Sequence, residues 1–350
     1  MITRTFQPAA LGIALIAAFA LVAPAPPGHA QVEAGDGIDF DTYVAQLAAR
    51  ARAEGVSAAT VRRMTTGLSP DPRVIRLDRG QPGSPTRRGY PALAPYIAKH
   101  VNSVRVNGGR RVFRENRATL RRVENDYGVP AEIIVAIFGH ETSYGRITGG
   151  FDLARSLATL AWEGRRRELF ADEFIALLKV ADRGFAREEM TGSWAGAMGY
   201  PQFLPSVYQR LAVDGDGDGR ANIFGNRADT FASIANYFRD AGWRIGQPWG
   251  VRANVPDGFD VSAYRSELEA PVCPRVHERH SRWLRIDEWR ELGVVPQRPL
   301  PGDTLVSLFQ PDGPGTPAWL LTGNYRVILE YNCSNYYAMS VGLLADEIVN

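Results

Sequence analysis

Residues 130–145 read PAEIIVAIFGHETSYG, and we expect the rest of the chain to fold around this stretch. Pro130 suits the first position of a helix, where its missing N–H is not needed. The apolar run Ile133–Phe138 covers nearly every face of that helix, which predicts an interior position. Glu141 shares a face with the end of this run, and Gly145 is expected to end the helix. The stretch therefore predicts a carboxyl group on an apolar helix face.

The environment predicted for Glu141 favours its protonated form. Apolar surroundings and the negative end of the helix dipole both raise the pKa of a carboxyl group. A glutamic acid that stays protonated near neutral pH can donate a proton to a leaving oxygen. His140 lies about a hundred degrees around the helix from Glu141, so it is not expected to be its partner. The alternative is a structural glutamate paired with an arginine, and the helix alone leaves both interpretations open.

The chain as a whole has the composition of an exported globular protein. Its 350 residues are 45% hydrophobic, enough for one large or two ordinary domains, and its net charge of +2 argues against a nucleic-acid binder. Residues 1–30 combine Arg4, a short apolar run and small residues at the end, the pattern of a cleavable secretory signal peptide. We therefore expect an exported protein, with an uncleaved anchor as the alternative. No cysteine follows the signal, so no lipid anchor is expected.

Two cysteines, Cys273 and Cys333, are the only ones in the chain. An oxidising exported compartment favours a disulfide between them. The alternative is a pair of free, buried thiols.

Hydrophobic periodicity predicts a mainly α fold with a small β part. Helices are expected at about 42–53, 57–64, 93–106, 111–127, 151–162, 165–180, 227–241 and 337–349. The proline- and glycine-rich residues 67–92 predict an extended loop. Short β-branched runs at 304–310 and 325–331 predict strands.

Residues 192–206 read GSWAGAMGYPQFLPS and have the composition of a ligand-binding loop. Glycines allow close approach of the backbone to a ligand. Aromatic rings such as Phe203 suit the faces of sugars, and Ser193 and Gln202 offer directional hydrogen bonds. The alternative is a tight connection between helices.

Residues 214–219 read DGDGDG and match the first half of a calcium loop, in which Arg220 would offer its carbonyl oxygen. Position 12 is Gly225 rather than glutamate, so Asp229 would have to reach back around a longer turn. The alternative is a turn without an ion. Any calcium here would be structural.

Near the C-terminus, residues 331–339 read YNCSNYYAM. Three tyrosines and two asparagines suit a carbohydrate-binding surface, although packing within a β-sheet explains the tyrosines equally well.

Together these motifs resemble the lytic murein transglycosylases of the membrane-bound lytic transglycosylase B type. The resemblance covers nearly all of the mature chain and is carried, in order, by PDPRVIRLDRGQP (70–82), IVAIFGHETSYG (134–145), SLATLA and RRR within 156–167, GSWAGAMGYPQFLPS (192–206), AVDGDGDGR (212–220), ANYFRDAGWRIGQPWG (235–250) and YRVILEYNCSNYYAMSVGLLAD (325–346).

The resemblance implies a role for each matching residue. Glu141 falls on the single catalytic acid/base, and Ser193 on the serine that bonds the substrate N-acetyl group. The residues that would hold the glycan are Gln202, Phe203, Tyr237, Tyr331, Asn332 and Tyr337. Arg166 and Arg167 match arginines near the peptide stem. The calcium loop falls on Asp214, Asp216, Asp218, Arg220 and Asp229. The chain departs from the family pattern in having His140 where a small apolar residue is expected, and one extra residue before Asp229.

The resemblance also implies a domain plan and a reaction. It predicts a signal peptide (1–30), an N-terminal helical segment (31–110), a lysozyme-like catalytic core (111–250) containing the calcium loop (214–229), and a small α/β lobe (251–350). The enzyme would cleave glycan strands of peptidoglycan with one carboxyl group and no catalytic cofactor, leaving a 1,6-anhydromuramoyl end. It would be a monomer, with cell-wall synthesis or division proteins as conceivable partners.

Two other functions stay open at this point. One is a hydrolytic muramidase, which needs a second carboxylate and for which Asp152 or Glu163 are the candidates. The other is a non-catalytic peptidoglycan-binding scaffold on the same fold.

Overall fold

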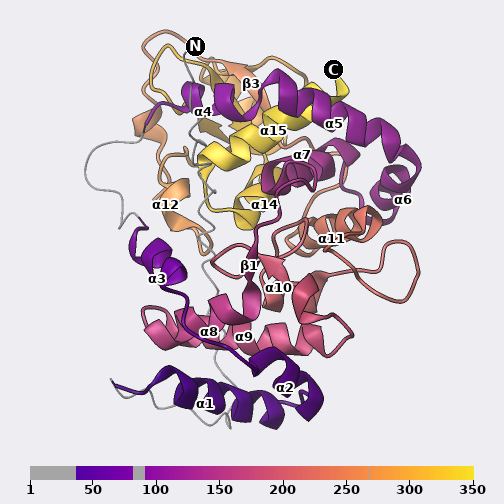
Figure 1. Cartoon of the computed structure of the whole chain (residues 1–350). Coiled ribbons are helices and arrows are strands. Elements are labelled where there is room, and N and C mark those ends of the chain that lie inside the picture. The colour runs from indigo at the N-terminus through magenta and orange to yellow at the C-terminus, as the bar shows by residue number, and fades with distance from the viewer. Residues whose placement is uncertain (1–36, 82–90, 268) are drawn as a thin grey trace, which may run out of the picture.

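The computed structural model describes residues 37–81, 91–267 and 269–350, so the predicted signal peptide lies outside the described residues. The described chain is mainly helical with two small antiparallel sheets (Figure 1), which confirms the predicted fold class. No helix within the described ranges is long and apolar enough to span a membrane.

The main helices have these bounds: α1 Phe40–Ala53, α2 Ala58–Thr65, α3 Pro72–Arg79, α4 Leu93–His100, α5 Ser103–Glu115, α6 Arg117–Tyr127, α7 Ala131–Thr142, α8 Leu153–Glu163, α9 Arg167–Ala181, α10 Pro205–Leu211, α11 Arg227–Asp240, α14 Gly323–Tyr331 and α15 Asn335–Val349. Two shorter helices are α12 Pro274–His277, whose Val276 packs against the buried residues around α7, and α13 Ile286–Glu291, which contacts the larger sheet.

The helices form two packed groups, which lie one above the other in Figure 1. The α9 cluster contains the buried faces of α1, α2, α3, α8, α9 and α10. The α7 cluster contains those of α5, α6, α7, α11, α14 and α15. Tyr237 and Tyr331, both partly buried, pack against both clusters. The two tyrosines therefore mark the junction between the groups.

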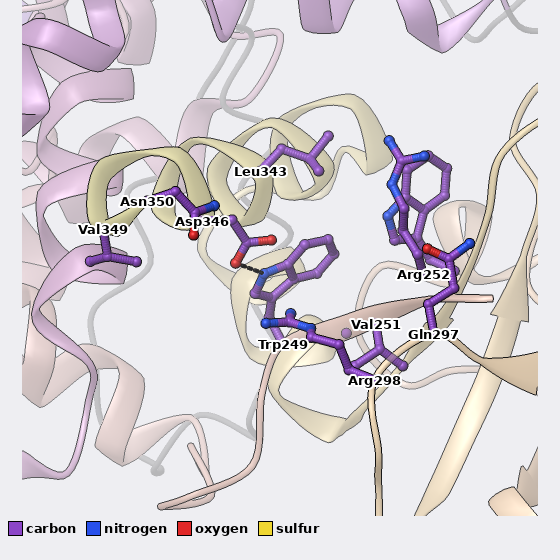
Figure 2. Close-up of a pocket in the computed structure, with 11 residues that line it drawn as sticks. Trp249, Val251, Arg252, Gln297, Arg298, Leu343, Asp346, Val349 and Asn350 are labelled. Carbon is purple, nitrogen blue, oxygen red and sulfur yellow. Dashed lines mark hydrogen bonds between the residues drawn. The ribbon is translucent and has the colours of Figure 1, made fainter.

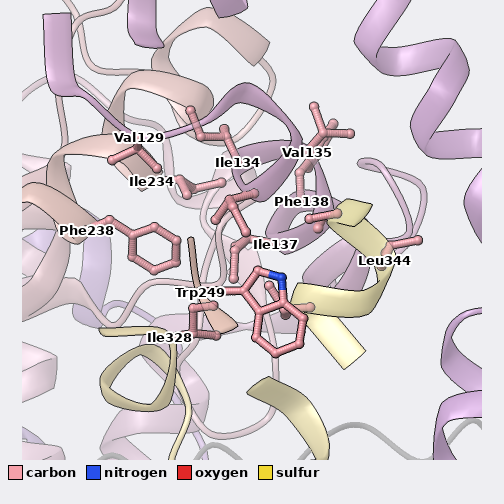
Figure 3. Close-up of a cluster of buried hydrophobic side chains, with 14 of the residues drawn as sticks. Val129, Ile134, Val135, Ile137, Phe138, Ile234, Phe238, Trp249, Ile328 and Leu344 are labelled. Carbon is pink, nitrogen blue, oxygen red and sulfur yellow. The ribbon is translucent and has the colours of Figure 1, made fainter. Parts of the chain in front are cut away.

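Helix α7 is the centre of its cluster, as the apolar run predicts. Ile134, Val135, Ile137 and Phe138 are fully buried. Figure 3 shows them surrounded by side chains from other elements, among them Val129, Ile234, Phe238, Trp249, Ile328 and Leu344. Burial of this many apolar side chains stabilises the position of the helix, because each contributes about 1.5–3 kcal/mol.

The end of α7 differs from the prediction. Gly145 was expected to end the helix, but the helix ends at Thr142. Ser143, Tyr144 and Gly145 all have positive φ angles, of 51°, 64° and 83°. The left-handed backbone at Tyr144 is unfavourable for a bulky residue, and it is held there because the ring is buried and its hydroxyl donates to the carbonyl of Arg105 (2.7 Å).

Two sheets complete the fold. Strands β1 (Phe151–Asp152) and β2 (Thr191–Gly192) form a small antiparallel pair. The larger sheet has the antiparallel order β4-β6-β7-β3-β5. Its strands are β3 Gly250–Asn254, β4 Trp283–Arg285, β5 Val295–Pro296, β6 Leu305–Phe309 and β7 Ala318–Leu321. One face packs on α13 around the buried Trp289. The predicted division of the chain at residues 110 and 250 stays a prediction, and residue 110 itself falls within α5.

Three further predictions of local structure were wrong. The expected loop 67–92 contains α3. The side chain of Asp71 caps this helix by accepting from the backbone N–H groups of Arg73 and Val74, and Pro72 occupies the first helical position. The expected strand 325–331 is part of α14, because tertiary packing of its apolar residues overrides their β propensity. The expected helices 93–106 and 111–127 are instead α4, α5 and α6, separated by breaks near Asn102 and Asn116.

A disulfide joins Cys273 and Cys333, which confirms the pairing that an oxidising compartment favours. The two residues are 60 positions apart in sequence, with their Cα atoms 5.4 Å apart. The bond connects the turn before α12 to the segment between α14 and α15.

We predict that replacing both cysteines by serine lowers the free energy of unfolding by about 3–4 kcal/mol, because a long loop is no longer closed in the unfolded chain. Urea unfolding followed by tryptophan fluorescence measures this. A reductant should lower the midpoint of the wild-type protein and leave that of the double variant unchanged. An unchanged wild-type midpoint would contradict the prediction.

Candidate active site

Glu141 lies in the last turn of α7, where α7 packs against α15. The residue is partly exposed. The hydroxyl of Tyr337, in the first turn of α15, donates to Oε1 of Glu141 at 2.6 Å. Tyr337 is itself buried, so this hydrogen bond fixes the carboxyl group at the junction of the two helices.

The protein raises the pKa of Glu141 to about 7, because burial penalises the charged carboxylate; the hydrogen bond from Tyr337 acts in the opposite direction. No arginine or lysine among the described residues forms an ion pair with Glu141. The alternative of a structural glutamate locked to an arginine therefore does not hold. Near neutral pH this carboxyl group can both give up and accept a proton.

Aromatic side chains from three separate segments gather beside Glu141. The ring of Phe203 lies 5.9 Å from that of Tyr237 and 6.0 Å from that of Tyr331, and the two tyrosine rings are 4.8 Å apart. Burial raises the pKa of Tyr331 well above its usual value, and the charge of Glu141 adds to this, so the two side chains are electrostatic neighbours. The site is therefore at the junction of the α7 and α9 clusters.

Hydrogen bonds to backbone carbonyls hold these tyrosines in place. The hydroxyl of Tyr331 donates to the carbonyl of Pro201 (2.6 Å), and that of Tyr237 donates to the carbonyl of Glu330 (2.8 Å). Each bond connects segments far apart in sequence. The rings therefore form a preorganised surface, of the kind on which sugar rings can stack.

The 192–206 loop is tightly folded, and its glycines are required for this. A Cβ atom on Gly192 would lie 2.1 Å from the carbonyl oxygen of Ala197, and one on Gly149 would lie 2.1 Å from the carbonyl oxygen of Gly192. Within the loop, Oγ of Ser193 accepts from the N–H of Ala197 (3.0 Å). The serine proton is therefore left for another acceptor.

Gln202 has a positive φ of 51° and is partly exposed. Its side-chain amide donates to the carbonyls of Thr148 (3.1 Å) and Gly199 (2.8 Å), which leaves its amide oxygen available to a ligand. Asn332 follows α14 directly and is buried next to the disulfide.

Arg166 and Arg167 are held by other contacts. Arg166 forms an ion pair with the buried Asp78 of α3 (2.6 Å), and Arg167 lies over the ring of Tyr43 (5.3 Å). Tyr43, which Arg167 contacts, belongs to the α9 cluster rather than to the aromatic group around Glu141. The predicted role of the two arginines near a peptide stem stays a prediction.

The two candidates for a second carboxylate are engaged elsewhere. Asp152 caps α8 and forms an ion pair with Arg187 (2.7 Å). Glu163 pairs with Arg79 (2.9 Å), and hydrogen bonds from Arg79 and Arg165 outweigh its burial and lower its pKa. No other carboxylate among the described residues perturbs the pKa of Glu141.

Sequence reasoning missed Tyr96, which lies in α4. Burial raises the pKa of Tyr96 and the charge of Glu141 contributes to this, so Tyr96 lies near enough to Glu141 for the charge to act on it. Nothing in the pattern of α4 marks this tyrosine. His140 was correctly excluded as a partner of Glu141: its ring lies beside Tyr337 (5.5 Å), and burial, with Arg105, lowers its pKa well below the usual value.

A second group of acidic side chains lies at the DGDGDG loop. Carboxylate oxygens of Asp214, Asp216 and Asp229 lie within 4.8 Å of one another. Asp229, on α11, is fully buried and reaches back to accept from the N–H groups of Gly215 (2.8 Å) and Asn222 (2.6 Å).

Burial raises the pKa of Asp229, with the charges of Asp216 and Asp214 as further causes, so the three carboxylates repel one another without a cation. Hard oxygen ligands of this kind suit calcium, and the residues present therefore fit the ion. Asp218 lies outside this group of carboxylates, because its side chain accepts from the N–H of Arg220 (2.8 Å). The carbonyl ligand predicted at Arg220 stays a prediction.

A carboxyl group with a pKa near neutrality beside an aromatic surface, at the junction of two helical clusters, is the arrangement expected of a lysozyme-like enzyme that acts on glycans. Comparison with known families agrees, because residues 39–346 match the Transglycosylase SLT domain. The chain belongs to this family, and it is a lytic transglycosylase.

Individual relatives support this assignment. The chain is 35% identical over 289 residues to membrane-bound lytic murein transglycosylase B of Escherichia coli (strain K12), covering 79% of this chain and 73% of that protein. SltB3 of Pseudomonas aeruginosa, solved in complex with NAG-anhNAM-pentapeptide, has a TM-score of 0.80 and 37% identity over 90% of this chain and 80% of its own. The E. coli lytic transglycosylase Slt35, solved in complex with calcium, has a TM-score of 0.70 and 30% identity. The match covers 88% of this chain and 92% of Slt35.

We predict that E141Q becomes more stable relative to the wild-type protein as the pH rises. The folded pKa of about 7 lies above the usual 4.5, so the folded wild type binds a proton that the unfolded chain has lost, and it loses stability between these pH values. Glutamine does not titrate. The difference in unfolding free energy should therefore change by about 2–3 kcal/mol in favour of E141Q between pH 4 and pH 8.

Urea unfolding at several pH values measures this difference. E163Q is the control with the opposite sign, since the folded pKa of Glu163 is lowered and the wild type gains stability as the pH rises. A pH-independent difference for E141Q would contradict the raised pKa.

Proposed function

We propose that the chain cleaves the β-1,4 bond between N-acetylmuramic acid and N-acetylglucosamine in peptidoglycan, with Glu141 as the only acid/base, and leaves a 1,6-anhydromuramoyl end. The observation that carries this proposal is the isolation of Glu141: it has a pKa near 7, a hydrogen bond from Tyr337 and no second carboxylate close by in the described chain. Hydrolytic glycosidases ordinarily use two carboxyl groups.

The reaction would need two proton transfers at one carboxyl group. Protonated Glu141 donates its proton to the glycosidic oxygen as the bond from muramoyl C1 to that oxygen breaks. The ionised Glu141 then accepts the proton of the muramoyl C6 hydroxyl, while the oxygen of that hydroxyl forms a bond to C1. Water is not consumed, and the carboxyl group ends in its starting state. A pKa near neutrality serves both steps, because neither form is strongly favoured.

Other side chains would orient the sugar. Ser193, whose hydroxyl proton has no acceptor within the described residues, is suited to donate to the carbonyl oxygen of the N-acetyl group. That oxygen could then stabilise the positive charge developing at C1. The rings of Tyr237 and Tyr331, which are partly exposed, would stack against the glycan, and the buried ring of Phe203 would support them from below. The free amide oxygen of Gln202 would accept from a sugar hydroxyl.

The test of this proposal is the E141Q variant acting on purified sacculi. Release of soluble fragments should fall by at least a thousandfold, while binding to sacculi is retained. E132Q, on the same helix, is the matched control and should keep wild-type activity. Mass spectrometry of wild-type products should show anhydromuramoyl ends. Products heavier by one water would support a muramidase instead, and unchanged E141Q activity would support a different catalytic group.

We predict that Y337F shifts the alkaline limit of activity to higher pH. The Tyr337 hydroxyl donates to the carboxylate and lowers the pKa of Glu141, so its loss raises that pKa and keeps the acid protonated further into the alkaline range. The pH dependence of kcat/KM on a soluble glycan measures the limit. Y336F is the control, because the Tyr336 hydroxyl donates to the carbonyl of Pro91 instead. A shift to lower pH would contradict this role.

We also propose that Asp214, Asp216 and Asp229 hold a structural calcium ion. Their convergence supports this, and a related enzyme has been solved in complex with calcium. The ion would offset the repulsion among the carboxylates and hold the loop against α11.

The corresponding prediction concerns thermal stability. Removing calcium with a chelator should lower the Tm of the wild type by several degrees, and calcium should restore it. D216N should weaken this response while leaving the chelated protein at least as stable, because one repelling charge is removed. A Tm that is the same with and without calcium would exclude the site.

We further propose that the protein works outside the cytoplasm as a periplasmic enzyme. Support comes from the signal-like residues 1–30, the disulfide and the similarity to an enzyme named as membrane-bound. Peptidoglycan glycan strands would be its main partner. A monomeric state and recruitment by cell-wall proteins stay predictions.

A further inference from the structure

A cavity of about 310 Å³ lies between the larger sheet and the C-terminal half of α15, and it has no part in the chemistry proposed above. Residues of β3, β7, the segment after β5 and α15 line it. None of them belongs to the group around Glu141. Figure 2 shows Arg298 beside Trp249 and Asp346, with Arg252 and Gln297 toward the other side of the cavity.

The floor of the cavity is rigid and aromatic. The indole of Trp249 is buried and its Nε1–H donates to Oδ1 of Asp346 (3.3 Å). Helix α15 crosses the ring closely at Gly342, where a Cβ atom would lie 2.5 Å from it. Trp319, also buried, lies under the guanidinium of Arg252 (5.2 Å). The apolar surface is thus fixed before any ligand arrives.

The rim of the cavity carries two arginines, Arg252 and Arg298. Burial raises the pKa of the nearby Asp346, and the charge of Arg298 acts on this carboxyl group in the opposite direction. Arg252 and Arg298 are exposed, and neither forms an ion pair with a carboxylate among the described residues. Many other surface arginines of the chain do form such pairs, including Arg79, Arg187 and Arg210. Oδ2 of Asp346 likewise has no hydrogen-bond donor in the described chain. Guanidinium groups above an indole suit a carboxylate with an apolar body, and the free Asp346 oxygen suits an N–H donor next to it.

We propose that this cavity binds the carboxylate end of a peptide stem of peptidoglycan, as a second substrate contact remote from the cleaved bond. This rests on the proposed function, which makes the substrate a glycan that carries peptides. The carboxylate meets Arg252 and Arg298, small side chains lie on Trp249, and a peptide N–H donates to Asp346. The volume is at the lower end for ligand cavities, which suits one or two small residues.

Peptide binding is tested in the full-length protein carrying E141Q, so that no glycan chemistry intervenes. The probe is free stem pentapeptide, titrated by calorimetry. R252Q/R298Q should weaken its Kd at least tenfold. R117Q/R121Q removes the same charge from exposed positions on α6 and should leave the Kd unchanged. The pentapeptide with amidated carboxyl groups should bind as weakly to the parent as the free peptide binds to R252Q/R298Q.

The same arginine variants with Glu141 intact separate this site from the catalytic one. R252Q/R298Q should digest intact sacculi several-fold more slowly than wild type, and sacculi stripped of stem peptides at the wild-type rate. Three results would each overturn the proposal. R252Q/R298Q could bind the peptide as tightly as its parent, the parent could bind the amidated peptide as tightly as the free one, or acetate at the concentration of the peptide could displace it. Persistence of cleavage in E141Q would contradict only the proposed mechanism, because the peptide titration does not depend on it.

Discussion

The hydrogen bond between the carboxyl group of Glu141 and the hydroxyl of Tyr337 is the constraint on which the rest of the site depends. It joins the end of α7 to the start of α15, and it is made in surroundings that penalise a charge. A neutral carboxyl group can occupy this place at low cost, whereas an ionised one needs the donor that Tyr337 provides. The apolar core that buries α7 therefore has a second effect beyond stability, because it sets the proton affinity of the group at its end.

The placement of the aromatic surface follows from the way the two helical clusters meet. Each cluster has its own apolar core, and Tyr237 and Tyr331 contact both. Their hydroxyls bond to backbone carbonyls, so the rings themselves remain as the surface beside Glu141. The cores thus position the site from both sides, and the disulfide restrains the segment between α14 and α15.

Sequence reasoning could predict what depends on local patterns. The apolar run before Glu141 indicated a buried helix and a raised pKa, and alternating aspartates indicated the loop where three carboxylates converge. It could not predict contacts between distant segments: Tyr337 is 196 residues from Glu141, and its position was known only from resemblance. Tyr96 escaped because a tyrosine on an ordinary short helix carries no local signal. The strand expected at 325–331 failed because burial in the α7 cluster outweighed β propensity.

The covalent bond from Cys273 to Cys333 has a consequence for when the enzyme becomes competent. Cys333 stands between Tyr331 and Tyr337, so the crosslink restrains the short segment that carries both aromatic side chains to Glu141. A newly made chain in a reducing cytoplasm would hold this segment by packing alone. For the periplasmic enzyme proposed above, oxidation outside the cytoplasm would then tighten this segment, so that full glycan-cleaving activity would develop only where peptidoglycan is present.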